Sequence, residues 1–131
     1  MDHEAAQHAI RRRALELPEA FEQERWGHPV FKLPKGDEGK LFCILSADGD
    51  VPVRATVKLD REEREVALTM PWCQVASYIG RWGWVTGEVV DDESLRAICD
   101  WLVESFWLNA PPRLRSAVEQ GPFWEGDDGD G

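Results

Sequence analysis

The alternation of hydrophobic and polar residues is clearest between residues 53 and 59. Apolar side chains occupy positions 53, 55, 57 and 59, and polar side chains occupy positions 54, 56 and 58. Successive side chains of a β-strand point to opposite faces of its sheet, so this spacing predicts a strand with one buried and one solvated face. A sheet with one solvated face is typical of antiparallel pairing.

Two shorter apolar runs precede this strand, at residues 30–33 and 40–46. Both are short enough to be buried strands, and the turn-forming residues 34–39 between them predict an antiparallel hairpin. Segments 18–29 and 71–77 follow neither a strand nor a helix period. We expect them to be irregular connections.

A further strand is predicted at residues 82–90. Its alternation would place Trp82, Trp84, Thr86 and Glu88 on one face. A small core does not readily take two Trp side chains from one strand face. The two rings therefore either pack between the sheet and its helices or form an aromatic surface.

Apolar residues at helical spacing predict two main helices. The first covers residues 2–17, and the second begins after a capping Asp at position 91 or 92. A shorter helix is expected at 61–70 and further helical turns at 113–120. The second main helix carries an apolar stripe formed by Leu95, Ile98, Cys99, Leu102, Val103 and Phe106.

The chain has a net charge of −10, but the charge is unevenly distributed. Residues 119–131 contain five acids and no base, whereas residues 26–60 contain five of each. The Gly- and Asp-rich end is expected to be an acidic, disordered tail. Nucleic-acid binding normally leaves a basic footprint, and the net charge shows none, so such binding would need a local basic patch.

Several function classes lack their sequence signatures. Three Cys at wide spacings form neither a disulfide framework nor a CxxC pair, and the three His lack metal-ligand spacing. We find no phosphate-binding loop, dinucleotide fingerprint or nucleophile elbow, and we therefore expect no cofactor and no metal. The polar start of the chain and the lack of a long apolar run predict a cytoplasmic protein.

Short motifs follow one another in the order helix, hairpin, strand, short helix, strand and long helix. They are Leu17-Pro18, Trp26-Gly27-His28-Pro29-Val30-Phe31-Lys32, Phe42, Val57-Lys58-Leu59-Asp60, Gly83-Trp84-Val85 and Asp91-Asp92-Glu93-Ser94-Leu95. In this order and spacing, the chain resembles the YjbR/MmcQ family of small bacterial proteins. The resemblance covers most of the chain before the acidic tail.

The resemblance implies an α+β "double-wing" fold similar to that of CyaY. In such a fold, one antiparallel sheet packs against the N-terminal and C-terminal helices, here within a single domain at residues 1–118. The family is named as DNA-binding on the basis of its fold similarity, and fold alone does not establish function.

The candidate residues fall into two sets. Nucleic acid would contact a solvated sheet face with Lys32, Arg54, Lys58, Arg81 and Trp84. A ligand or partner surface would include Trp26, His28, Tyr78 and Trp82.

These candidates support three different function classes. The first is a non-enzymatic module that binds nucleic acid. The second is a protein-interaction or regulatory module anchored by the Trp-rich segment, without nucleic-acid binding. The third is an enzyme or small-molecule binder built around Trp26 and His28, which would need a deep pocket and a second titratable group.

Overall fold

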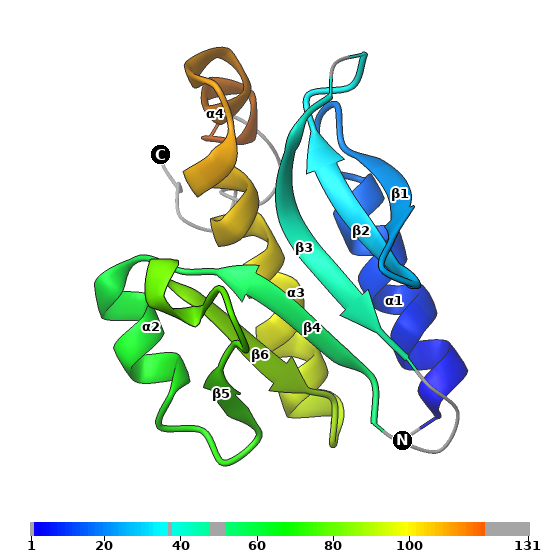
Figure 1. Cartoon of the computed structure of the whole chain (residues 1–131), viewed down its shortest axis with the longest axis vertical. Helices are drawn as coiled ribbons and strands as arrows, with labels where there is room; N and C mark the ends of the chain where they lie inside the picture. Colours follow the sequence, from blue (N-terminus) through cyan, green and yellow to red (C-terminus); the bar gives the residue numbers. More distant parts are fainter. Residues whose placement is uncertain (1, 37, 48–51, 120–131) are drawn as a thin grey trace, which may run out of the picture.

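The computed structural model describes residues 2–36, 38–47 and 52–119, and Figure 1 shows their arrangement. One antiparallel sheet is covered on a single face by helices. Its six strands are β1 (Phe21–Arg25), β2 (His28–Leu33), β3 (Lys40–Ser46), β4 (Arg54–Lys58), β5 (Cys73–Val75) and β6 (Trp84–Glu88). The helical elements are α1 (His3–Leu15), α2 (Arg61–Ala67), the 3-10 turn η1 (Gly80–Trp82), α3 (Asp92–Asn109) and α4 (Pro112–Glu119).

The sheet confirms the predicted α+β class and antiparallel pairing. The strand order is β1-β2-β3-β4-β6-β5, and every neighbouring pair is antiparallel. The predicted hairpin is present as β2 and β3. The predicted alternation in β4 is confirmed, because residues 53, 55, 57 and 59 are buried and residues 54, 56 and 58 are only partly exposed.

The helices begin within one residue of their predicted starts, but α1 ends at Leu15 and α2 at Ala67, before the predicted ends at 17 and 70. The side chain of Asp2 accepts a hydrogen bond from the Glu4 amide at the start of α1. Asp91 and Ser94 form a reciprocal capping box at the start of α3. Ile98, Leu102 and Phe106 of α3 are fully buried, so this helix supplies the centre of the core under the sheet. The residues expected to form the acidic tail, except Glu119 at the end of α4, lie outside the described residues.

The two halves of the sheet separate where β3 and β4 stop pairing. Their ladder ends at the pair Cys43 and Val57, although β3 continues to Lys40. At this point the buried hydroxyl of Ser105, on α3, donates to the carbonyl oxygen of Phe42 at 2.6 Å. The same hydroxyl accepts a hydrogen bond from the amide of Lys58 at 2.9 Å. The helix thus replaces the next rung of the ladder and holds the halves apart (Figure 1).

Three sequence predictions are wrong in detail. Segment 18–29 contains the edge strand β1, and segment 71–77 contains β5. The strand predicted at 82–90 begins only at Trp84, because Trp82 belongs to η1. Consequently, Trp82 and Trp84 do not share a strand face.

Candidate functional site

The sheet face that points away from α1 and α3 contains most of the candidate residues. We call it the outer face. Its members alternate with residues that face the helices, such as Ala55, Val57 and Val85. The outer face comprises Phe21, Gln23 and Arg25 of β1, His28, Val30 and Lys32 of β2, Leu41, Ile44 and Ser46 of β3, Arg54, Thr56 and Lys58 of β4, Gln74 of β5, and Trp84, Thr86 and Glu88 of β6.

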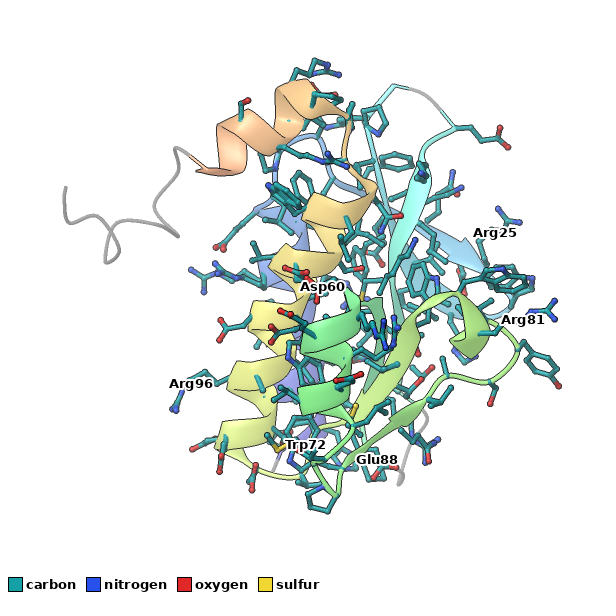
Figure 2. The ribbon with its side chains drawn as sticks, turned by 90° about the vertical axis from the view of Figure 1, so that its left-hand side faces the viewer. Arg25, Asp60, Trp72, Arg81, Glu88 and Arg96 are labelled. Carbon is teal, nitrogen blue, oxygen red and sulfur yellow. The ribbon has the colours of Figure 1, made fainter. Side chains whose placement is uncertain are left out.

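Figure 2 shows that Arg25 and Arg81 project on the side of the molecule opposite to Arg96 of α3. Arg81 of η1 therefore adds a cation to the outer-face side of the molecule. The strands of the outer face carry four cations, on Arg25, Lys32, Arg54 and Lys58, and one carboxylate, on Glu88. The local charge is thus opposite in sign to the net charge of −10.

Two of these five cations are held by neighbouring side chains. Arg54 forms a salt bridge of 2.8 Å with Glu88 on the adjacent strand. Lys32 is only 7% exposed, and its Nζ donates to Oε1 of Gln23 at 3.3 Å. The remaining cations, on Arg25, Lys58 and Arg81, form no salt bridge within the described part of the chain.

The hydrophobic part of the outer face is buried despite having no helix over it. Trp84 is 8% exposed, and Val30 is completely buried. Next to them, the hydroxyls of Thr56 and Thr86 share a hydrogen bond of 2.8 Å across β4 and β6. Trp84 and Lys32 are therefore buried parts of the outer face, and neither presents a free side chain to a ligand.

Trp26 lies at the tip of the β1–β2 hairpin. Trp26 and Gly27 both have positive φ angles, 55° and 78°, which a two-residue turn of type I′ requires. The indole is 69% exposed, and the guanidinium carbon of Arg25 lies 5.0 Å from its ring centroid. Such a stack keeps a planar cation and an aromatic ring together at the surface. The neighbouring His28 is partly buried in β2.

The segment before β6 presents a second stack of the same kind. The guanidinium carbon of Arg81 lies 4.3 Å from the ring centroid of Trp82, which is 55% exposed. Gly83 then turns the chain into β6 with a φ angle of 96°. Tyr78, just upstream, is 95% exposed. The exposed aromatic rings therefore come from the two ends of the sheet and not from a single strand.

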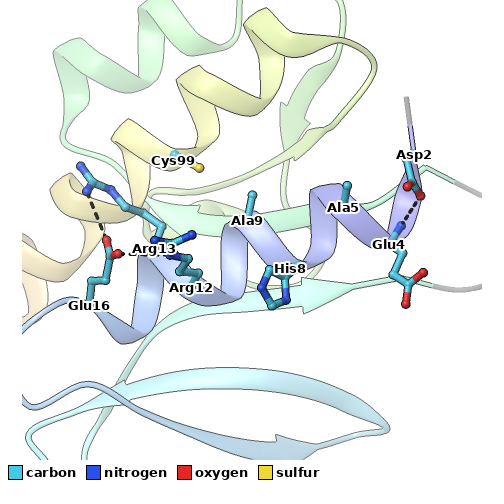
Figure 3. Close-up of a pocket in the computed structure, with 9 residues that line it drawn as sticks. All are labelled: Asp2, Glu4, Ala5, His8, Ala9, Arg12, Arg13, Glu16 and Cys99. Atoms are coloured by element: carbon cyan, nitrogen blue, oxygen red, sulfur yellow. Dashed lines mark hydrogen bonds and ion pairs between the residues drawn. The ribbon is translucent and has the colours of Figure 1, made fainter.

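A separate hollow lies on the helix side, along α1 (Figure 3). It is broad and open, with a volume of about 630 Å³, and Cys99 of α3 forms part of its wall. Burial raises the pKa of the Cys99 thiol, which lowers its reactivity. Arg12 and Arg13 in this hollow both pair with Glu16, and Arg11 pairs with Glu22. The Arg11–Arg13 run is therefore an ion-paired helix face.

Other kinds of site find no support in the described ranges. No group of three or more His, Cys, Asp or Glu residues within them is placed to hold a metal ion. A second surface hollow, about 430 Å³ in volume, is lined by Arg11, Glu22, Gln23, Glu24 and Pro29 and does not include His28. No described helix is long and apolar enough to cross a membrane.

Comparisons with known proteins agree with this architecture. The family model YjbR matches residues 15–108. The crystal structure of the Deinococcus radiodurans protein DR2400, described with the domain DUF419, superimposes with a TM-score of 0.65 at 21% identity. The match covers 76% of this chain and 74% of that one, and at this identity it shows the shared fold. No curated protein matches the sequence.

Proposed function

Since the chain belongs to the YjbR family, whose model covers most of it, we propose that it is a non-enzymatic module that binds single-stranded nucleic acid on its outer face. One observation carries the proposal. The outer-face side displays two exposed Trp rings, each overlaid by an Arg, and the three cations Arg25, Lys58 and Arg81, which form no salt bridge within the described residues. Exposed rings next to cations are the features that bind bases and phosphates without sequence preference.

The contacts divide between the two parts of a nucleotide. Bases would stack on Trp26 and Trp82, where each stacked base contributes about 1–3 kcal/mol. Phosphates would pair with Arg25, Lys58 and Arg81, the cations on this side that form no salt bridge with any described residue. A single strand suits this surface better than a duplex, because its unpaired bases expose their aromatic faces.

The number of free cations sets the expected salt dependence. Each phosphate contact to a single strand lowers the logarithm of the binding constant by about 0.7 per tenfold rise in salt. Three contacts therefore predict a slope of about −2. A slope near zero would contradict a phosphate-binding surface.

The direct test is binding of a labelled oligo-dT strand and of a duplex to the full chain at low salt, followed by fluorescence anisotropy. Trp26→Ala and Trp82→Ala should each weaken binding of the single strand by roughly 5- to 150-fold, the equivalent of about 1–3 kcal/mol. Arg25→Ala and Arg81→Ala should each reduce the salt slope by about 0.7. Arg96→Ala is the matched control, because Arg96 is exposed on the opposite side (Figure 2). The absence of detectable binding to either nucleic acid would refute the proposal.

The exposure of Tyr78 favours a second function, which is binding of a protein partner. Tyr78 and Trp82 lie four residues apart, and both rings are mostly exposed. Tyr and Trp are the side chains that most often dominate protein interfaces. A partner retained by the native chain and lost by both Tyr78→Ala and Trp82→Ala, with no nucleic-acid binding, would establish this alternative in place of the first.

A further inference from the structure

Two exposed aromatic residues are held in a backbone conformation that bulky side chains disfavour. Among the described residues other than Gly, three have a positive φ angle: Glu19 at 59°, Trp26 at 55° and Tyr78 at 65°. In this left-handed region the Cβ lies too close to the following carbonyl oxygen. Each of the three residues therefore lowers the stability of the fold unless its own contacts compensate.

Glu19 and Tyr78 differ in the contacts that they make. The carboxylate of Glu19 forms a salt bridge of 2.7 Å with Arg113, so this side chain has a partner within the fold. Tyr78 is 95% exposed, and it makes no side-chain hydrogen bond or ring contact with any described residue. The fold thus gains little from the Tyr78 ring that would offset its left-handed backbone.

Trp26 departs from the residue preference of its own turn. A type I′ turn favours Asn, Asp or Gly at both central positions, and here the second position is Gly27 but the first is Trp26. The indole stacks only on the neighbouring Arg25 and is mostly exposed. Trp26 and Tyr78 are also the two most exposed large apolar side chains among the described residues. Strain and exposure therefore coincide at these two positions.

Backbone strain that the fold itself does not require is typical of sites that bind a ligand. We infer that Trp26 and Tyr78 are strained because their rings are displayed to a ligand, and that Tyr78 is a third base-stacking residue in addition to Trp26 and Trp82. The inference rests on the proposed function for the identity of the ligand. The strain itself is measurable without any ligand.

The loop that carries Tyr78 also carries the second Trp–Arg stack. Residues 77–83 connect β5 to β6, and the amide of Ala76 donates to the carbonyl oxygen of Trp84 at 3.1 Å at the base of this loop. Arg81 of the same loop projects on the outer-face side (Figure 2). A base stacked on Tyr78 would therefore belong to the same bound strand as a phosphate paired with Arg81.

The salt dependence distinguishes a stacking residue from a phosphate contact. Loss of one stacking ring weakens single-strand binding by roughly 5- to 150-fold, the equivalent of about 1–3 kcal/mol. The phenol ring carries no charge, so its loss should leave the slope of affinity against salt unchanged. Loss of Arg81 should reduce that slope. Tyr78 thus has an expected binding signature of its own.

The test replaces each ring by Asn, which tolerates a left-handed backbone better than an aromatic residue does. Trp26→Asn and Tyr78→Asn should each raise the Tm by about 2–5 °C, because the strain is relieved, and should each weaken binding of oligo-dT. Trp82→Asn is the matched control, since Trp82 is an exposed ring in η1 without a positive φ angle. It should weaken binding and give no rise in Tm. Tyr78→Phe restores the ring and should therefore restore the affinity without a gain in Tm.

The inference and the proposed function fail in different ways. If the native chain binds oligo-dT and Tyr78→Asn binds it as tightly, the inference is overturned and the proposed function stands on Trp26 and Trp82. A Tm that rises in neither Trp26→Asn nor Tyr78→Asn, or that rises equally in Trp82→Asn, would overturn the inference whatever the affinities are. Absence of oligo-dT binding by the native chain would refute the proposed function and, with it, the base-stacking role of Tyr78.

Discussion

Ser105 offers the sharpest test of how α3 shapes the sheet. Its hydroxyl is fully buried and bridges two backbone groups, the carbonyl of Phe42 and the amide of Lys58. Ser105→Ala would remove the bridge and leave both groups without their partner. The packing around the site would change little, because the two side chains differ by one oxygen atom.

The expected cost follows from the two hydrogen bonds. A buried polar group left unsatisfied costs about 1–3 kcal/mol. Ala has a higher helix propensity than Ser, which returns roughly 0.5 kcal/mol. For the two groups together, we therefore expect Ser105→Ala to lower the free energy of unfolding by about 1.5–5.5 kcal/mol. With a urea m-value of about 1.5 kcal/mol per molar, the unfolding midpoint would fall by roughly 1–3.5 M.

Urea unfolding followed by Trp fluorescence measures this change, with Ser116→Ala on the exposed side of α4 as the control. Native-state hydrogen exchange gives an independent reading. The Lys58 amide should lose more protection than the global destabilisation accounts for, because its acceptor is gone. If Ser105→Ala costs no more than Ser116→Ala, and the Lys58 amide keeps its protection, the Ser105 bridge does not hold the halves of the sheet in place.

Three further predictions concern strain, pH and thiol chemistry. Gly83→Ala should lower the free energy of unfolding, measured by thermal denaturation, by about 1–3 kcal/mol. A Cβ at φ 96° is strained and would lie 2.7 Å from the guanidinium of Arg64. Gly36 also has a positive φ but has open space around it, so Gly36→Ala should lower the free energy of unfolding by less. Burial and the nearby Asp60 raise the pKa of Glu104, so stability is lost as pH rises from the ordinary Glu pKa through the raised one. Glu104→Gln should therefore raise the Tm at pH 7, and the gain should shrink as pH falls toward about 4, the ordinary Glu value; an equal gain at both pH values would contradict this. Burial raises the pKa of Cys73 to about 11, so a thiol reagent at pH 8 should label it much more slowly in the native than in the unfolded protein, and equal rates would contradict its burial.

Regular periodicity decided which strands the sequence predicted. The alternation at residues 53–59 predicted β4 correctly, because that strand has one face on the core and one on solvent. Strand β1 gave no such signal, since Phe21 is its only apolar residue. It is an edge strand, paired only with β2 and tied to α1 by the Arg11–Glu22 salt bridge. Charged residues are typical of edge strands, and they hide the period from sequence analysis.

The two neighbouring Trp residues show a different limit. A period of two placed Trp82 and Trp84 on one strand face, yet one is mostly exposed and the other is buried. The reason is Gly83, whose positive φ ends η1 and starts β6, so the alternation begins only after it. A Gly within a strand pattern marks a bulge or a turn, but the pattern alone does not distinguish them.

The candidate site depends on charge pairing, and sequence analysis does not reveal the pairs. Glu88 pairs with Arg54 from 34 positions away, and Glu19 pairs with Arg113 from 94 positions away. Only the fold shows which cations stay free. The net charge of −10 is a poor guide for the same reason, because salt screens exposed charges over about 8 Å at physiological ionic strength. A ligand on the outer face would lie beyond that distance from carboxylates behind the helix layer, and it would respond mainly to Arg25, Lys58 and Arg81. The local field at the sheet, and not the charge of the whole chain, therefore decides whether an anionic ligand binds there.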